Sequence, residues 1–370
     1  TLVSTPDRHL VFFGTETTIG TTSTQDDMYI RWSDQESINA STSYAPSAIN
    51  TAGTQRLADG TRIVSAIRGR DAIYVWTDTS LFIMRFVGAP FVFSFQQVGT
   101  NCGLIGKNAA VEVDGSAYWM SENGFFRYTG KLDSLACLVE DYVYDDINTI
   151  PRQHIYAGLN NLFGEVTWFY PGSGAASNNR SVTYNYMDST PERPVWTTST
   201  LARSTWADSA IFGKPHGTEY DSDATSDTTV GNTDGVTTYY EHETGQDQIK
   251  AGARTGISAS IESGDFDISR TQQGGADIRG DGEYMMKIRR VLPDFLSQTG
   301  DARVTLNLKN YPTDSQASSS LGPFTSTTST TKIDTRARAR AISLKVDNTS
   351  TKQHWKLGTF RLDIQPDGRR

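Results

Sequence analysis

The stretch AIYVWTDTSLFIMRF, residues 72–86, contains two runs of apolar, β-branched and aromatic residues that are joined by four polar residues. Runs of this composition are typical of β-strands, and the polar residues 77–80 between them supply a turn. The stretch therefore predicts two antiparallel strands in a hairpin.

Hairpin patterns recur along the first two-thirds of the chain. In one of them the dipeptide Asp114-Gly115 separates two short apolar runs, and Asp-Gly favours the positive φ angles of a tight hairpin turn. The further hairpins that the sequence predicts pair residues 110–113 with 117–120 and residues 155–157 with 166–170.

Tryptophans recur in these strand-like runs. Successive members of one set are separated by 44, 43 and 49 residues: Trp32, Trp76, Trp119 and Trp168. This spacing is close to the roughly 40 to 50 residues of one four-stranded propeller blade. Trp196 and Trp206 break the period, so a plain antiparallel sandwich with scattered aromatic residues stays as the alternative.

The prediction for the whole chain is a mainly β fold with one or few short helices. We expect a β-propeller-like domain at residues 1–245 and a second region, an antiparallel β-sandwich or platform, at residues 246–370. Strands of the second region are predicted at residues 257–262, 287–291, 304–308 and 341–346.

Three segments do not follow the strand pattern. Residues 134–148 place apolar side chains at helical spacing and precede Pro151, so a helix is predicted there. Residues 214–235 are polar and acidic, and residues 313–331 are rich in Ser and Thr. Both of the latter segments are predicted to be loops.

The composition limits the classes of function. The formal net charge is −8, whereas proteins that grip nucleic acid are usually basic on the binding face. No apolar run approaches the roughly 20 residues of a membrane span, so a soluble chain is expected. The two cysteines, Cys102 and Cys137, are expected to be small buried thiols of a protein that folds in a reducing cytoplasm.

The N-terminus has no initiator methionine. A strand-like run follows almost at once, at residues 10–14. This start is typical of a fragment or of part of a longer polypeptide.

No catalytic residue, metal site or cofactor is predicted. His242, between two glutamates, is the most notable histidine, with an ordinary residue at a strand end as the alternative. Residues 221–232 imitate the start of a calcium loop but lack its turn glycine and its final glutamate, which favours a solvated acidic loop.

Three carboxylates in the second region form a weaker candidate site. Asp265 and Asp267 would share one face of a strand, and Glu262 lies nearby in the sequence. Glycosidases use paired carboxylates, but their chemistry depends on a separation that spacing along a strand does not give. We therefore expect structural roles for these residues.

The most distinctive charge pattern alternates arginine with alanine. Arg336, Arg338 and Arg340 would place three guanidinium groups on one face of a strand, and these are the candidates for a subunit interface. The apolar residues at 342, 344 and 346 share that parity, so we expect either a bulge near Ala341 or an arginine row buried against an acidic neighbouring subunit. A solvated edge strand and bound phosphate are the alternatives.

Several strings, in this order along the chain, resemble the tail nozzle proteins, also called tail tubular protein B, of short-tailed bacteriophages. They are DRHLV at 7–11, IRWSDQE at 30–36, VWTDT at 75–79, AAVEVDG at 109–115 and LDIQPDGRR at 362–370. The resemblance covers nearly the whole chain. Members of that family usually carry a further β-rich portion at the N-terminus, which this sequence lacks before Thr1.

The resemblance implies a structural subunit and no enzyme. Such a subunit carries a β-propeller and forms a six-fold ring, a homohexamer, at the distal end of the virion tail, after assembly in the host cytoplasm. Its implied partners are the tail adaptor ring, tail fibres or spikes, and viral DNA that passes through the lumen without specific binding. Because basic walls would retain a polyanion, a lumen lined by Asp, Glu, Ser, Thr and Asn is expected.

Two other functions compete with this one. A carbohydrate-binding adhesin of the virion would stack sugars on exposed Tyr and Trp side chains presented on a similar β scaffold. A glycosidase would use Glu262, Asp265 or Asp267. Neither alternative accounts for the ordered strings.

Overall fold

The computed structural model describes residues 2–4, 7–208, 211–221, 236–250, 252–268, 271–273, 276–278, 284–311 and 319–368. These residues form a mainly β fold of antiparallel sheets, as the sequence predicted, with one α-helix among them, α1 (Glu140–Asp146). The chain divides into two compact units, Thr1–Glu243 and Thr244–Arg370. Within the described residues no helix combines the length and the apolar character that a membrane crossing requires.

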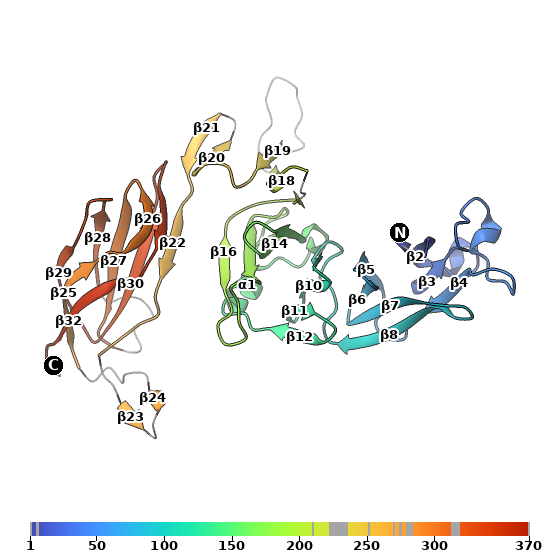
Figure 1. The fold of residues 1–370 in the computed structure, drawn as a ribbon, viewed down its shortest axis with the longest axis horizontal. Coiled ribbons are helices and arrows are strands. Elements are labelled where there is room, and N and C mark those ends of the chain that lie inside the picture. The colour runs from blue at the N-terminus through green and yellow to red at the C-terminus, as the bar shows by residue number, and fades with distance from the viewer. Residues whose placement is uncertain are drawn as a thin grey trace. The chain divides into compact units, whose positions relative to one another are not determined.

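Successive antiparallel sheets make up the N-terminal unit, and in each sheet the strands lie in chain order (Figure 1). The first sheet contains β1 (Leu2–Ser4), β2 (His9–Glu16), β3 (Gln25–Trp32) and β4 (Gly53–Arg56). The second contains β5 (Ile63–Arg68), β6 (Ile73–Thr77), β7 (Ser80–Gly88) and β8 (Val92–Thr100). The third contains β9 (Ala110–Val113), β10 (Ser116–Ser121), β11 (Gly124–Tyr128) and β12 (Leu132–Leu135).

The fourth sheet contains β13 (Tyr156–Asn160), β14 (Glu165–Tyr170), β15 (Arg180–Asn185) and β16 (Trp196–Ser199). A three-stranded sheet of β17 (Thr205–Ala207), β18 (His216–Asp221) and β19 (Val236–Glu241) follows. The predicted hairpins are confirmed as β6–β7, β9–β10 and β13–β14. In the second of these, Asp114 has φ 48° and Gly115 has φ 84°, which is the backbone of a tight hairpin turn.

The hairpin at residues 72–86 is apolar at successive positions because both of its faces are buried. Along β6, Ile73 and Val75 enter the core shared with the first sheet, whereas Tyr74 and Trp76 enter the core shared with the third and fourth sheets. Side chains alternate between the two faces of a strand, so a strand between two cores needs apolar residues at both parities. The hairpin therefore joins neighbouring sheets.

The repeated tryptophans fill these cores. Trp76, Trp119 and Trp168 each lie in the second strand of a sheet and are fully buried, whereas Trp32 lies in the third strand of the first sheet. The rings of Trp76 and Trp119 have centroids 5.4 Å apart, and the indole of Trp168 donates a 3.0 Å hydrogen bond to the carbonyl of Ala109. The aromatic repeat thus fastens each sheet to the next.

Two predictions for the N-terminal unit are wrong in extent. The predicted helix at residues 134–148 is reduced to α1, because Ser134 and Leu135 pair with β11 as the end of β12. The predicted loop at 214–235 contains strand β18, whose backbone pairs with both β17 and β19. Residues 222–235 lie outside the described part of the chain.

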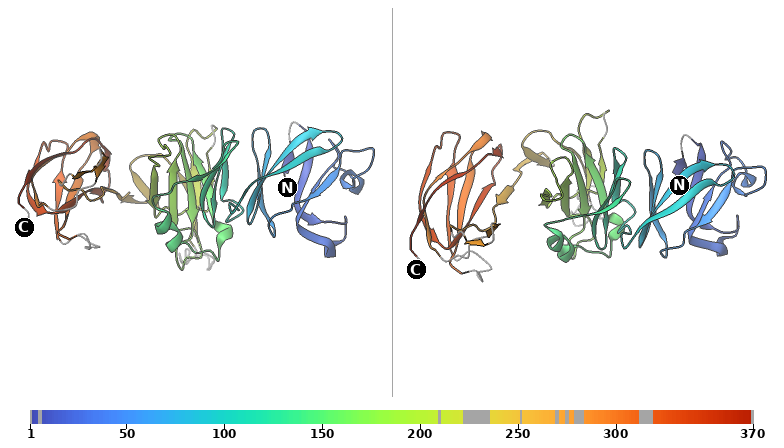
Figure 2. Two further views of the ribbon diagram at one scale, coloured as in Figure 1. Left: turned by 90° about the horizontal axis from the view of Figure 1, so that it is seen from below. Right: turned by 60° about the horizontal axis from the view of Figure 1, so that its bottom comes forward.

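The C-terminal unit is a β-sandwich, in which two sheets share one core. One sheet has the order β22 (Ala259–Glu262), β30 (Ala341–Asn348), β27 (Ala302–Lys309) and β28 (Ser319–Ser326), and the other has the order β29 (Ile333–Ala339), β25 (Met286–Leu292) and β32 (Arg361–Pro366). Core residues come from both sheets, among them Ile288, Val291, Val304, Leu306 and Ile342. Figure 2 shows this unit from two further sides.

Three two-stranded ribbons complete the unit: β20 (Asp247–Lys250) with β21 (Ala253–Gly256), β23 (Thr271–Gln273) with β24 (Ala276–Ile278), and β26 (Phe295–Thr299) with β31 (His354–Leu357). The Ser/Thr-rich stretch predicted as a loop at 313–331 includes strand β28, which pairs with β27. Residues 313–318 of that stretch are outside the described residues. Backbone pairing with a neighbouring strand thus overrides a polar composition.

Candidate interaction surfaces

The three carboxylates of the second region do not form a paired site. The Oε1 atom of Glu262 accepts hydrogen bonds from Asn307, at 2.7 Å, and from Ser343, at 2.6 Å. Asp265 forms a 2.6 Å ion pair with Lys309. Asp265 and Asp267 flank a single bridge residue, Phe266, so the strand that was predicted to carry them is not formed.

His242 lies just beyond β19, and its ring contacts a buried guanidinium. Its Nε2 atom accepts a 2.9 Å hydrogen bond from Nε of Arg203, which is 4% exposed. Arg203 also lies 4.0 Å from the ring of Tyr240 and 3.6 Å from Glu219. Burial, with the nearby Arg203 cation, lowers the pKa of His242 to about 4. The ring is therefore neutral near pH 7. Its hydrogen bond with Arg203 links the end of β19 to the segment that leads into β17.

The described residues contain no group of three or more His, Cys, Asp or Glu side chains with metal-ligand geometry. The sequence that imitates a calcium loop, at 221–232, falls almost entirely outside the described residues. Both cysteines are free thiols; Cys102 is buried and Cys137 is half-buried.

The arginine row ends where the chain changes sheet. Arg336 and Arg338 point outward from β29, alternating with the fully buried Ala337 and Ala339. The chain bends at Arg340, and the next residue begins β30 in the other sheet of the sandwich. The predicted bulge near Ala341 is therefore a complete strand break, which removes the conflict between arginines and core residues of the same parity.

Of the arginines, Arg338 forms a 2.5 Å ion pair with Asp367. Arg336 lines a shallow hollow of about 480 Å³ beside β28, together with Leu321, Pro323 and Phe324. The hollow thus combines a cation with apolar walls.

Many hairpin turns of the N-terminal unit lie at the same end of its sheets. Each four-stranded sheet turns there between its first and second strands and between its third and fourth, because the connection to the next sheet lies at the opposite end. Contacts between sheets show that these turns share one end. Tyr74, after the β5–β6 turn, donates a 3.0 Å hydrogen bond to Gly115 in the β9–β10 turn, and the Asn161 amide donates a 2.7 Å bond to Asp208.

Large apolar side chains are exposed at this end. Phe91 lies at the β7–β8 turn and is 77% exposed, and Leu162, at the β13–β14 turn, is 61% exposed. We call the following set the apolar end: Phe86, Val87, Phe91, Leu162, Phe163, Met187, Ile211 and Phe212. Apolar residues gathered at exposed sites in this way mark interaction surfaces.

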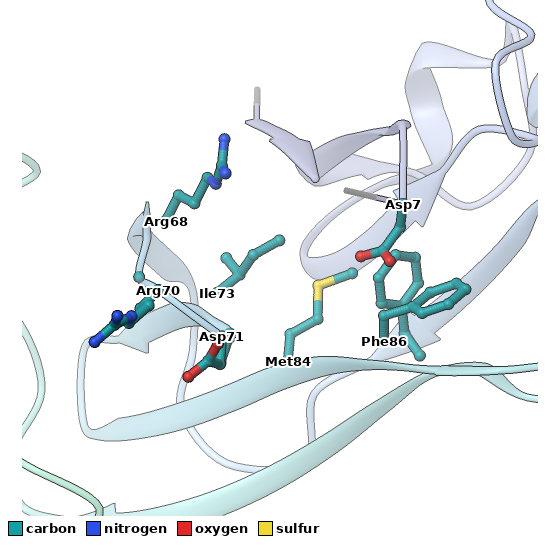
Figure 3. Close-up of a pocket in the computed structure, with 10 residues that line it drawn as sticks. Asp7, Arg68, Arg70, Asp71, Ile73, Met84 and Phe86 are labelled. Carbon is teal, nitrogen blue, oxygen red and sulfur yellow. The ribbon is translucent and has the colours of Figure 1, made fainter. Parts of the chain in front are cut away.

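A hollow of about 230 Å³ lies at the same end, between the first and second sheets (Figure 3). In Figure 3 Asp7 lies on one side, Arg68 and Arg70 lie on the other, and Met84 is between them. Arg68, Arg70 and Asp71 are exposed and form no ion pair with any residue that the structure describes. The hollow can accept a side chain that carries both an apolar body and a charged or polar end.

The sequence reasoning missed the apolar end, although a signal was present. Turns normally carry Gly, Asn, Asp, Pro and Ser. Here Phe91 follows Ala89-Pro90, and Leu162-Phe163 stand between Asn161 and Gly164. Bulky apolar residues at the tips of predicted hairpins are thus a sign of an interface.

The sequence matches no protein-family model and no curated protein.

Proposed function

We propose that this chain is a structural subunit of a bacteriophage tail, forming the distal nozzle ring of the DNA-ejection conduit. The proposed assembly is a homohexamer in the virion tail, formed in the host cytoplasm, in contact with the tail adaptor ring and with tail fibres or spikes. The succession of four-stranded antiparallel sheets in chain order supports it, because the blades of β-propellers are four-stranded antiparallel sheets. The ordered strings are the second support.

The apolar end is the observation that carries the proposal. A closed ring requires that each subunit contact its two neighbours through different surfaces. Phe91 and Leu162 present apolar area that a monomer leaves in water, at a cost of roughly 25 cal/mol for each Å². We assign this end to the contact with a neighbouring copy, and the hollow near Asp7 to a side chain of that copy.

The proposed conduit also needs a wall to which DNA does not adhere. Counterion release gives DNA affinity for basic surfaces, so an acidic wall lets the polyanion slide. Residues 1–243 contain 28 Asp and Glu against 15 Lys and Arg, a formal charge of −13. We therefore propose that the N-terminal unit lines the passage.

The two alternative functions have less support. The sugar-binding adhesin was expected to use exposed Tyr and Trp side chains; each of the seven tryptophans is buried or half-buried, whereas Tyr142, Tyr239 and Tyr311 are exposed. The glycosidase was expected to use Glu262, Asp265 or Asp267; of these, Glu262 is held by Asn307 and Ser343, and Asp265 is held by Lys309.

Electron microscopy and mass photometry of the purified chain test the proposal. We expect the unaltered chain to form rings of six copies, and the Phe91→Ser/Leu162→Ser variant to remain monomeric. The matched control is Leu138→Ser/Ile150→Ser, which removes two similarly exposed apolar side chains from the opposite end of the sheets. Rings in the first variant, or a monomeric unaltered chain, would refute the proposal.

A further inference from the structure

The two units of the chain carry opposite charge. Residues 1–243 have a formal charge of −13, whereas residues 244–370 contain 14 Asp and Glu against 19 Lys and Arg, a formal charge of +5. The overall acidity of the chain therefore hides a basic C-terminal unit. Complementary potentials of this kind direct association and select partners.

Six of the 19 basic side chains of the C-terminal unit lie on the outer face of the sheet β29–β25–β32. We call this surface the basic face. Its cations are Lys287, Arg289, Arg290, Arg336, Arg338 and Arg361, and its carboxylates are Asp334, Asp363 and Asp367. The opposite face of the same strands is the core side, which carries residues such as Ile288, Val291 and Ala337.

The register places cations directly beside one another. Lys287 lies opposite Arg338 in the β25–β29 ladder, and Arg289 is the extra residue of a bulge in β25. Like charges at opposed positions of a ladder repel, and within the chain the ion pair of Arg338 with Asp367 offsets only part of that cost. A partner that supplies carboxylates to this face would offset that cost.

Some carboxylates of the basic face already form ion pairs within the chain. Asp334 forms ion pairs with Arg290, at 2.9 Å, and with Lys332, at 3.0 Å. Arg289 and Arg336 have no such partner among the described residues, and both are exposed. These two guanidinium groups are the ones best placed to pair bidentately with carboxylates from outside.

A hollow with one apolar wall adjoins the cations. Arg336 and Asp334 border it on β29, and Leu321, Pro323 and Phe324 border it on β28. Protein interfaces combine an apolar centre with a polar rim, and a hollow of about 480 Å³ has room for a large side chain. The surface thus has both components of a protein-binding site.

We propose that the basic face binds the acidic N-terminal unit of a second copy of this chain. This inference rests on the proposed function. It identifies the surface of a second copy that the arginine row would contact. A second copy always brings one unit of formal charge −13.

Sedimentation velocity of the full chain tests the inference at about 0.1 M and at about 1 M NaCl, where the Debye length falls from about 10 Å to about 3 Å. We expect oligomers at the lower salt concentration and weaker association at the higher one. The variant Arg289→Glu/Arg336→Glu should raise the dissociation constant at the lower salt concentration at least about tenfold.

The control is Arg62→Glu/Lys107→Glu, which makes the same change of net charge at two exposed residues of the N-terminal unit. This control should associate as the unaltered chain does or more tightly. Association that is equally weakened in both variants would overturn the inference, since it would reflect net charge alone. Binding of a labelled DNA duplex that is lost only in Arg289→Glu/Arg336→Glu, without a change in self-association, would also overturn it.

The outcomes separate this inference from the proposed function. Rings that form normally in Arg289→Glu/Arg336→Glu would refute the role of the basic face and leave the nozzle proposal standing. An unaltered chain that is monomeric at both salt concentrations would refute both.

Discussion

The ring of His242 lies against the indole of Trp206, with 4.4 Å between the ring centroids. The same indole donates a 2.7 Å hydrogen bond to the carbonyl of Leu159 in β13. Trp206 therefore attaches the three-stranded sheet to the fourth sheet, and His242, just beyond β19, packs against it. The protonation state of one imidazole thus bears on how firmly the last sheet of the N-terminal unit is held.

Acid should weaken the fold through His242. Its pKa is lowered from 6.5 to about 4, chiefly by burial, so the unfolded chain binds a proton at this ring more readily than the folded chain does. Stability from this group is complete above about pH 6.5 and is lost as the pH falls towards about 4. Denaturant midpoints at about pH 7 and about pH 5 should differ more for the unaltered chain than for His242→Phe. Equal differences would contradict this assignment.

Gly103 should not tolerate a side chain. A Cβ atom at this position would lie 2.1 Å from the carbonyl oxygen of Asp78. The Asp78 backbone cannot easily move, because the Cys102 amide donates a hydrogen bond to the carbonyl of the adjacent Thr79. We expect Gly103→Ala to lower the free energy of unfolding by about 1–3 kcal/mol. The control, Gly264→Ala, meets nothing within 4 Å and should stay within about 0.5 kcal/mol of the unaltered chain. Urea unfolding measures both, and equal stabilities would refute the close contact.

Trp119 should be among the costliest core residues to remove. It is fully buried, packs against Trp76, and donates a 2.7 Å hydrogen bond to the carbonyl of Cys102. Trp119→Ala should cost about 3–5 kcal/mol of unfolding free energy. Trp355→Ala, at a half-buried position of the C-terminal unit, should cost less. Calorimetry of both variants checks the order, and the reverse order would contradict the core assignment.

Both thiols should react slowly in the folded chain. Burial raises the pKa of Cys102 and of Cys137 to about 11, so little thiolate forms at about pH 8. A thiol-specific chromogenic reagent should label neither residue rapidly, and should label both once guanidinium unfolds the chain. Rapid labelling of Cys137 without denaturant would show that its side chain is more accessible than the structure indicates.

Sequence reasoning located the hairpins well but misjudged three polar or mixed segments. Residues 72–86 carry their own information, because apolar runs and a polar turn act over a few residues. In contrast, β18 and β28 are held by the backbones of their neighbours, which composition does not reveal. The predicted helix lost its first turns because Leu135 pairs with Phe125, and Leu138, which should have faced the core, is 77% exposed.

The mainly β class and the tight turn at Asp114-Gly115 follow from local properties of the sequence, namely side-chain alternation and turn chemistry. The positions of the surfaces depend instead on how the folded chain packs. The break at Arg340 sends β29 and β30 into different sheets and leaves Arg336 and Arg338 on an outer face. The apolar end exists only because the packing of successive sheets brings turns that are far apart in the chain to one end, and no local pattern encodes that alignment.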